Sequence, residues 1–484
     1  MINQNLNCPD DIHRVGIIGG GIAGSTIALR LGELGINVTI FEKGNSLVNG
    51  PPICHLHAGG NFYRDISDQQ CLTLLRQSID TLKVYPSSAN VRPTVVALPN
   101  TYKNKPKDLE PRLKLLQSEY ANLIKKDISN KVLGSVEDYY RFYSREEIVL
   151  LSAKAMPVTP ECLDDWMIPV AKNIDMDQIQ FPILLVQEYG LSIFRLAAIA
   201  ELASEKLPDV NIRTNTQVTS ITKCNDKSGW VVTTYDDSGN TESMKVNYLV
   251  NACGFKTGEI DDMLNVKRER MVEFKAAYLA HWDDYQGQWP EVIFYGERGT
   301  PEGMAQLTPS NNGYFQLHGM TEEITLFKGG RAITNENSSQ PILPKHLLNK
   351  IYRSWPAGSI LTRTQKSIQH ISKFLPNFNN AVLGGAPLFG AQQIPGIDPK
   401  LRVADVNFIG DNYACIEIVK ASSALDSADL VINKLIESKK FSLIDSKKDV
   451  QSHYFPITKS LSISKVRAKG KSIAKQRSYP IHLV

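Results

Sequence analysis

The chain has 484 residues, 42% of them hydrophobic and 21% charged, with a net charge of +4 at pH 7. This composition excludes a wholly disordered, collagen-like or coiled-coil protein. A single hydrophobic core stops growing at roughly 250–300 residues, so the length predicts two domains. No stretch is long and apolar enough to predict a membrane-spanning helix. The nearest, residues 183–202, contains Glu188, Arg195 and Glu201 and is expected to form a soluble amphipathic helix.

The positive charge is concentrated in residues 441–484, which we expect to form a basic tail. Asp449 is the last acidic residue, and seven basic residues follow it: Lys459, Lys465, Arg467, Lys469, Lys471, Lys475 and Arg477. The rest of the chain is net negative, which argues against nucleic acid as a partner. Two interpretations of the tail stay open: a disordered solubilising arm, or an amphipathic helix that makes peripheral contact with an anionic membrane.

The cysteines favour a cytoplasmic protein. There are seven of them at scattered positions, with no Cys-x-x-Cys pair, which favours reduced thiols over a disulfide framework. The first residues, MINQNLNCPDDIHR, lack the basic patch and apolar stretch of a signal peptide. The expected localisation is therefore cytoplasmic, with the tail as a candidate contact to the inner face of a membrane.

A glycine-rich segment near the start has the context of a nucleotide-binding unit. Residues 14–18 (RVGII) predict a buried strand, and residues 19–24 (GGGIAG) follow at once. Residues 25–34 have the apolar spacing of a helix, and residues 37–41 (NVTIF) predict a second strand that ends at Glu42. This order of strand, glycine motif, helix, strand and acid makes the motif specific for a dinucleotide.

Each glycine of the motif has a physical role. Gly19 allows the tight turn, Gly21 lets a pyrophosphate approach the backbone, and Gly24 lets helix and sheet pack closely. The free N–H groups at the helix N-terminus favour phosphate. Glu42 can accept hydrogen bonds from both hydroxyls of an adenosine ribose. The motif alone fits FAD and NAD equally, because both contain an ADP half.

Three later segments resemble the D-amino-acid-oxidase-like (DAO) family of FAD-dependent oxidoreductases. This family includes glycine and sarcosine oxidases, 2-hydroxyglutarate dehydrogenase and malate:quinone oxidoreductase. The segments are 211–222 (NIRTNTQVTSIT), 248–254 (YLVNACG) and 406–411 (VNFIGD). A helix-like stretch at 421–436 follows the last of them.

The resemblance implies FAD as the cofactor and assigns residues to it. Val218 would contact the adenine through its backbone, and Gly254 would lie beside the pyrophosphate. Gly410 and Asp411 would meet the ribityl chain and the pyrophosphate.

The resemblance also implies an α/β fold, with a Rossmann-like FAD-binding domain of the DAO type and a second, β-rich α+β substrate domain. We place the FAD-binding domain in residues 12–95, 185–265 and 370–440, and the substrate domain in residues 96–184 and 266–369. Strand-like runs support a β-rich second domain, at 273–280, 291–295 and 313–318.

Two segments contain candidate catalytic histidines. In hydroxyacid-oxidising relatives a similar Gly-rich stretch with a His or Ser lies along the flavin, and residues 55–60 (HLHAGG) resemble it. This implies His57 as a candidate general base for the substrate proton, with His55 on the same side of the chain by alternation. The alternative is a loop that packs on the flavin without proton transfer. His318, at the end of a strand expected over the flavin, is a second candidate, or else a sheet histidine without a catalytic role.

Arginines near these segments are candidates for binding a substrate carboxylate, because a guanidinium can bind one through two hydrogen bonds. Arg64 and Arg298 are the leading candidates, with Tyr63 as another donor and a surface salt bridge as the alternative role. We predict no metal site, because His55 and His57 lack further ligands nearby in the sequence.

These features predict an FAD-dependent oxidoreductase that oxidises a small amino or hydroxy acid by hydride transfer to flavin N5, with oxygen or a quinone as acceptor. A second hypothesis is a membrane-associated dehydrogenase like malate:quinone oxidoreductase, supported by the His-Ala-Gly segment, the chain length and the basic tail. Outside metabolism, the alternatives are a flavoprotein acting on tRNA and a non-catalytic flavin-binding scaffold. The negative main body argues against the first, and the intact glycine motif argues against the second.

Overall fold

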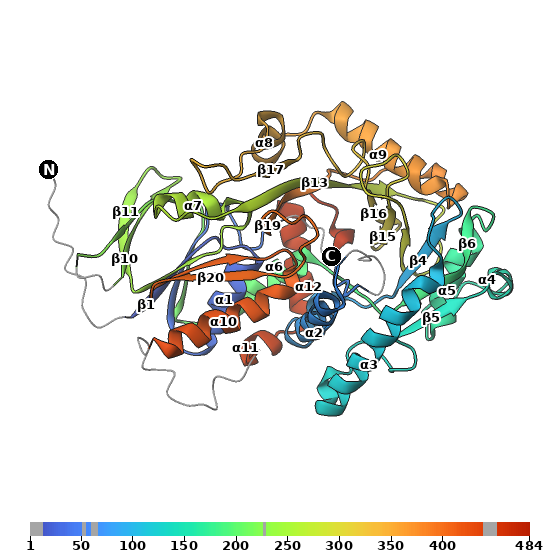
Figure 1. Ribbon diagram of the computed structural model, residues 1–484, viewed down its shortest axis with the longest axis horizontal. Helices are drawn as coiled ribbons and strands as arrows, with labels where there is room; N and C mark the ends of the chain where they lie inside the picture. The colour runs from blue at the N-terminus through green and yellow to red at the C-terminus, as the bar shows by residue number, and fades with distance from the viewer. Residues whose placement is uncertain (1–12, 51–54, 60–65, 226–228, 439–452) are drawn as a thin grey trace.

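The computed structural model describes residues 13–50, 55–59, 66–225, 229–438 and 453–484. The molecule is elongated, with two main sheets, and the long strand β13 (Arg270–His281) runs along one side of it (Figure 1). Helices α8 (Lys345–Tyr352) and α9 (Ala357–Ser372) lie along the same side as β13.

The first sheet has six strands in the order β20-β21-β12-β1-β2-β8. Their bounds are β1 (Arg14–Ile18), β2 (Asn37–Phe41), β8 (Val210–Arg213), β12 (Tyr248–Asn251), β20 (Asp405–Ile409) and β21 (Tyr413–Glu417). All neighbours are parallel except β20, which is antiparallel to β21. The strands β1 and β2 are short runs rich in β-branched residues and almost fully buried, which is typical of a parallel sheet covered by other layers.

Helices and a small sheet cover the six-stranded sheet. Helix α1 (Ile22–Glu33) packs on β2 and contacts both α6 (Ile193–Ser204) and α10 (Ala424–Glu437). A three-stranded antiparallel sheet is formed by β9 (Thr216–Lys223), β10 (Trp230–Asp236) and β11 (Thr241–Val246). Its buried side chains share one apolar cluster with Ile18, Phe41 and Tyr413 of the six-stranded sheet.

The second main sheet has the strand order β17-β13-β16-β15-β14-β4-β6-β5, with β18 and β19 also paired to β13. The bounds of its further strands are β4 (Thr94–Pro99), β5 (Tyr140–Tyr143), β6 (Ile179–Val186), β14 (Glu291–Phe294), β15 (Ala305–Pro309), β16 (Tyr314–Gly319), β17 (Arg331–Ile333), β18 (Val382–Leu383) and β19 (Leu388–Pro395). Two short strands form a separate pair, β3 (Ala89–Asn90) and β7 (Gly190–Leu191). The second unit is therefore rich in β-structure, as expected.

The remaining helices are α2 (Asp68–Val84), α3 (Glu110–Lys126), α4 (Arg145–Ser152), α5 (Leu163–Asn173), α7 (Thr257–Met263), α11 (Pro456–Lys459) and α12 (Ile463–Gln476). Among the residues that the structure describes, no helix has the length and apolar character needed to cross a membrane.

Two sequence-based expectations differ from the structure. Residues 382–395, which we placed in the FAD-binding segment 370–440, pair with β13 and belong to the second sheet. Residues 183–202 do not form one helix, because the run 183–186 pairs with β4 as the end of β6 and α6 begins only at Ile193. A short apolar run fits a buried strand and a buried helix equally well, so its period cannot distinguish them.

The described part of the basic tail is an ordered helix, which contradicts the interpretation as a disordered arm. In the part that the structure describes, residues 453–484, helix α12 packs against α6 with Val466 and Ile473 buried. The Lys469 ammonium lies 2.8 Å from a Glu201 carboxylate oxygen in α6. The apolar face of the helix is thus already covered by the protein, so a membrane contact would have to use the exposed basic face alone.

A buried ion-pair network joins the start of β13 to the six-stranded sheet. Arg270 is fully buried, and its Nε donates a hydrogen bond of 2.9 Å to Glu417 at the end of β21. One Nη group pairs with Asp261 of α7, and the other donates to the Ser339 carbonyl at 2.9 Å. The two sheets are therefore connected through charges that have no access to water.

Candidate active site

The glycine motif forms the turn from β1 into α1, at the carboxyl edge of the six-stranded sheet. Gly19 has a φ of +97°, and an added Cβ there would lie 2.6 Å from the Ala252 carbonyl oxygen. A Cβ at Gly24 would lie 1.9 Å from the Gly19 carbonyl oxygen. At Gly21, by contrast, an added Cβ would meet no atom within 4 Å. The turn is closely packed around one open position, as a backbone that receives a pyrophosphate requires.

Glu42 lies directly after β2, beside this turn. Its carboxylate accepts hydrogen bonds of 2.6 Å from the backbone N–H groups of Gly20 and Gly44. A carboxylate has about four lone-pair sites, so two such bonds leave acceptor capacity for ribose hydroxyls. The structure therefore fixes the Glu42 side chain at the position where the sequence predicted a ribose contact.

Two further predicted cofactor residues lie close to the glycine turn. Gly254 follows β12, the parallel neighbour of β1, with a φ of +57° and open space around the position of a Cβ. Val218 lies in β9 with its side chain buried in the cluster that contains Phe41. The Thr216 N–H donates to the Glu42 carbonyl at 2.9 Å, which holds β9 next to the end of β2.

The structure contradicts the prediction for Gly410 and Asp411. These residues belong to the turn between β20 and β21, and β20 is antiparallel to β21. Since β21 is parallel to β12, the turn lies at the amino edge of the sheet, opposite Gly19. The residues that reach the glycine edge instead follow Glu417 and lead into α10, at 418–423. A strand–turn–strand pattern, VNFI-GDN-YACIE, was the signal that could have revealed this hairpin.

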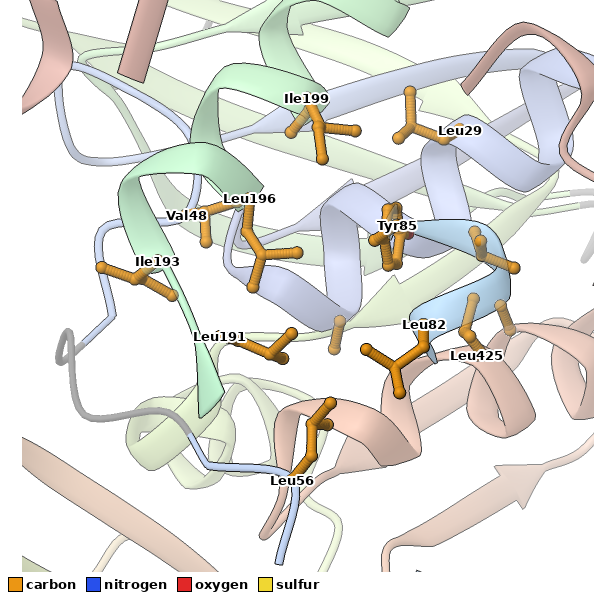
Figure 2. Close-up of a cluster of buried hydrophobic side chains, with 14 of the residues drawn as sticks. Leu29, Val48, Leu56, Leu82, Tyr85, Leu191, Ile193, Leu196, Ile199 and Leu425 are labelled. Carbon is orange, nitrogen blue, oxygen red and sulfur yellow. The ribbon is translucent and has the colours of Figure 1, made fainter. Parts of the chain in front are cut away.

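The segment with His55 and His57 is anchored by the residue between them. Leu56 points into the apolar core beneath α1 and α6, on the side of Leu191 and Leu82 (Figure 2). The two histidines share the opposite side of the chain, and their rings stack with centroids 4.8 Å apart.

Glu291, the first residue of β14, contacts both histidines, and we call His55, His57 and Glu291 the histidine–glutamate cluster. Its Oε2 lies 3.1 Å from His55 Nδ1, and its Oε1 lies 3.1 Å from His57 Nε2. The three side chains are 10%, 4% and 1% exposed in that order, so the contacts are shielded from water. Gln306 of the neighbouring strand β15 donates its side-chain amide to the same carboxylate. The sequence analysis missed Glu291, although an acid at the start of the apolar run EVIFY is unusual.

His318 lies on β16, directly opposite Gln306 on β15. Its ring meets that of His55 edge-on, with centroids 5.9 Å apart, and its Nδ1 has no hydrogen-bond partner among the described residues. Burial lowers the pKa of His318 to about 3, so its imidazole is neutral near pH 7. The structure therefore brings this predicted residue to the edge of the histidine–glutamate cluster.

The electrostatics of the cluster suit an acceptor of one proton. Burial alone would raise the pKa of Glu291, but the charges of His55 and His57 outweigh it and hold this pKa well below its usual range. Burial lowers the pKa of His55, although the Glu291 carboxylate opposes this effect. Near neutral pH the His55 imidazole is therefore neutral, and the Glu291 carboxylate can stabilise the cluster once it takes up a proton.

A partly open cavity lies beside the cluster, and we call it the Arg92 cavity. His55 and Arg92 line it, and the rest of its wall comes from Asn90, Leu191, Ser192, Ile193, Phe194, Thr308, Ser310, Gln316, Leu388 and Leu483. Arg92 lies between β3 and β4, and its Nε is buried without a hydrogen-bond partner in the described part of the chain. Burial lowers the pKa of Arg92, against the opposing charge of Glu291, but a guanidinium stays protonated at physiological pH. Arg92 is therefore a cation that faces a cavity.

The other arginine candidates are placed differently. Arg64 and Tyr63 lie outside the described residues. Arg298 donates an Nη hydrogen bond to the Glu273 carboxylate in β13, which two further cations share. Because Arg298 is committed to this carboxylate, Arg92 takes its place as the described candidate for binding a substrate anion.

Glu291 changes the argument about metal binding, since it supplies the third ligand that the sequence seemed to lack. Ligand atoms of His55, His57 and Glu291 lie within 4.8 Å of one another. However, the charges of Lys420 and Arg92 act on this cluster and would repel a divalent cation. The positive surroundings favour an anion in the cavity over a metal ion in the cluster.

A second group of potential metal ligands is explained by a protonated histidine. His453 Nε2 lies 3.3 Å from both Asp426 and Asp429, and its Nδ1 lies 3.6 Å from Asp80. Burial alone would lower the pKa of His453, but hydrogen bonds to Asp426 and Asp80 raise it to about 9. With carboxylates on both sides of the ring, the imidazolium itself balances their charge.

Comparison with known proteins extends over almost the whole chain. Residues 17–49 match the family model of the NAD(P)-binding Rossmann-like domain, and no curated protein matches the chain by sequence. Among solved structures, the chain is similar to glycine oxidase from Geobacillus kaustophilus, with a TM-score of 0.55, 14% identity, and coverage of 89% of this chain and 96% of that one. The chain is also similar to L-proline dehydrogenase from P. horikoshii, with a TM-score of 0.56, 15% identity, and coverage of 87% of this chain and 94% of that one. A third similar structure is L-alpha-glycerophosphate oxidase from Mycoplasma pneumoniae, with a TM-score of 0.54, 16% identity, and coverage of 89% of this chain and 95% of that one. The chain therefore shares the fold of these oxidoreductase structures, with a Rossmann-like dinucleotide domain and a β-rich second domain.

Proposed function

We propose that the chain is an FAD-dependent oxidoreductase that oxidises a small amino or hydroxy acid. The observation that carries this proposal is the histidine–glutamate cluster beside a cavity that contains the Arg92 guanidinium. The cluster offers a base for the proton of an amine or hydroxyl, and the guanidinium offers a partner for a carboxylate. A small acid presents both groups.

The described residues fit FAD as the cofactor. Gly21 and Gly254 leave open space at the turn where a pyrophosphate would lie, and Glu42 has acceptors for the adenosine ribose. A solved structure of similar fold, that of L-alpha-glycerophosphate oxidase, has FAD bound. Bound FAD would supply the acceptor for the hydride that leaves the substrate carbon.

The chain's own residues would handle the substrate proton. His57 is the proposed base. Because its Nε2 faces the Glu291 carboxylate, Nδ1 is the atom that would take the proton of the substrate O–H or N–H group. Glu291 Oε1, 3.1 Å from Nε2, would then stabilise the imidazolium. His55 and Gln306 hold the same carboxylate, which limits its movement.

The second enzyme hypothesis, a membrane-associated dehydrogenase like malate:quinone oxidoreductase, has the same chemistry with a quinone as acceptor. The histidine segment and the exposed lysines of α12 still support it, but the apolar face of that helix is used inside the protein. Oxygen and a quinone thus both stay in the proposal as electron acceptors.

One purified sample tests the proposal. Acid precipitation should release yellow FAD into the supernatant, and anaerobic addition of one amino or hydroxy acid from a panel should bleach the flavin absorbance. A colourless protein that does not take up added FAD would overturn the cofactor. Flavin that no acid bleaches would overturn the substrate class.

Replacing Gly21 with valine should abolish most FAD binding while the apoprotein keeps its melting temperature. The new side chain meets open space in the protein itself, but it fills the position that the pyrophosphate needs. FAD content per chain and the Tm of the apoprotein are the two measurements.

Gly358→Val in α9 is the matched control, because its Cβ also meets no atom within 4 Å but lies outside the glycine turn. Equal FAD content in Gly21→Val and Gly358→Val would mean that the pyrophosphate does not bind next to Gly21.

Replacing Arg92 with glutamine should raise the KM for the acid substrate about ten- to a hundredfold. A hydrogen bond to a charged group contributes about 1.5–3 kcal/mol, and glutamine loses the charge and one of the two donors. Steady-state kinetics with the best acid of the panel gives the measurement. The KM of Arg92→Lys should lie between those of the wild type and Arg92→Gln, because lysine keeps the charge but lacks the paired N–H donors of the guanidinium. Arg353→Gln, at an exposed position, is the control. If Arg92→Gln changes the KM no more than this control does, Arg92 does not bind the substrate carboxylate.

A further inference from the structure

Residues 477–484 complete the wall of the Arg92 cavity. Leu483 lines the cavity together with His55 and Arg92, which come from the first hundred residues. The sequence predicted only a basic tail here, either a solubilising arm or a contact to a membrane. Its contacts instead attach it to both sides of the candidate active site.

One attachment is to the loop that follows β2, on the cofactor side. The Arg477 guanidinium donates hydrogen bonds to the Leu47 carbonyl at 2.7 Å and the Val48 carbonyl at 3.0 Å. It also donates to the Ser46 hydroxyl at 3.1 Å. The segment is thus tied to the loop that begins just after Glu42.

The other attachments are to the second sheet. The Tyr479 hydroxyl donates to the Pro387 carbonyl at 2.9 Å, next to β19. The His482 ring stacks on Tyr314 of β16 with centroids 5.4 Å apart, and the Asn311 N–H donates to the His482 carbonyl at 3.1 Å. On the other side of Leu483, the Val484 carbonyl accepts a hydrogen bond of 3.3 Å from Asn311 Nδ2, so both chain neighbours of Leu483 are held.

The chemistry of the cavity wall defines what it can receive. Among the described residues that line it, Arg92 is the only cation, His55 is the only other titratable group, and the remaining polar residues are neutral. A large part of the wall is apolar, with Leu483 and Leu388 packed in one apolar cluster. An acid with an apolar side chain satisfies both parts, because it pairs its carboxylate with Arg92 and removes hydrocarbon from water.

We propose that the preferred substrate is an acid with an apolar side chain, and that Leu483 is a specificity-determining residue that limits the length of this side chain. This inference rests on the proposed function, since it assigns the acid to the same cavity. A leucine that is anchored on both sides acts as a fixed stop, whereas a mobile one would yield to a longer ligand.

Binding of a series of 2-oxo acids, from pyruvate to 2-oxooctanoate, tests the proposal. These compounds are the products of oxidising the corresponding hydroxy acids, so their binding can be followed by calorimetry without turnover. Wild-type protein should bind one chain length best. Leu483→Ala should move this optimum to a longer acid and improve the affinity for that acid about tenfold, since each extra methylene in an apolar pocket is worth at least that factor. Leu483→Phe should move the optimum to a shorter acid.

Ile481→Ala is the matched control, because this residue lies in the same segment with its side chain 41% exposed. Its length profile should equal that of the wild type. If an amino or hydroxy acid reduces the wild-type flavin but neither Leu483 variant shifts the profile of 2-oxo acid binding, the inference is wrong and the proposed function stands. If no 2-oxo acid binds and no amino or hydroxy acid reduces the flavin, the proposed function and the inference fail together. The Phe variant keeps the test decisive if the Ala variant loosens the segment.

Discussion

Replacing Glu291 with glutamine should slow the reduction of bound FAD by its substrate about 10²–10⁴-fold, the usual contribution of a general base. The carboxylate lies 3.1 Å from each of His55 and His57, and an uncharged amide cannot stabilise the protonated imidazole. Anaerobic stopped-flow absorbance measures the rate. FAD content should not change, because Glu291 lies on β14 and not at the glycine turn.

The pH profile separates this role from a purely structural one. The Glu291 charge raises the pKa of His55 against the effect of burial. Without this charge the pKa of His55 falls, so the histidine–glutamate cluster takes up a proton only at lower pH and the acidic limb of the rate profile should move downward. Glu297→Gln, at an exposed site on the loop after β14, is the control. A reduction rate and a profile equal to those of this control would remove Glu291 from the mechanism.

The second large effect is expected on the free energy of unfolding, from a substitution in the buried ion-pair network. Replacing Arg270 with methionine should lower the free energy of unfolding by about 3–5 kcal/mol, the usual cost of removing one member of a buried ion pair. Asp261 and Glu417 are 0% and 1% exposed, so both carboxylates would lose their closest cation without gaining contact with water. Urea denaturation followed by circular dichroism gives the measurement.

Lys267→Met provides the comparison, since Lys267 is an exposed cation a few residues before Arg270. The prediction requires that the Arg270 variant unfold at clearly lower urea than this control. Equal midpoints would show that Arg268, whose guanidinium lies 3.6 Å from a Glu417 oxygen, takes over the pairing.

The sequence predicted those parts of the site that depend on neighbouring residues. The bounds of β1 and β2 match residues 14–18 and 37–41, and the glycines between them form the expected turn. These features follow from local rules, because a strand, a tight turn and a helix start are determined within a few residues. The alternation around Leu56, which puts His55 and His57 on one side, is local in the same sense.

Contacts between distant segments could not be predicted in this way. His55 and Glu291 are 236 positions apart, and they meet because His55 forms a bridge with Gly190 while Glu291 begins β14, which pairs with β4. Gly410 and Asp411 were misplaced for a related reason, because their motif says nothing about the direction of the strand that contains it. Leu483 was missed since its role depends on the packing of α12 against α6, not on its own neighbours.

The strand order of the six-stranded sheet has a consequence for how the protein is made. Its central strand β1 is synthesised near the start, but β12 and β21, which complete one side, follow only at residues 248–251 and 413–417. At about 5–20 residues per second, roughly 20–80 s separate β1 from β21 on the ribosome. During this interval the apolar edge of the growing sheet has no partner, and exposed strand edges of this kind promote aggregation. The nascent chain should therefore depend on chaperones, and it can acquire a complete dinucleotide site only after β21 and the segment behind it have left the ribosome.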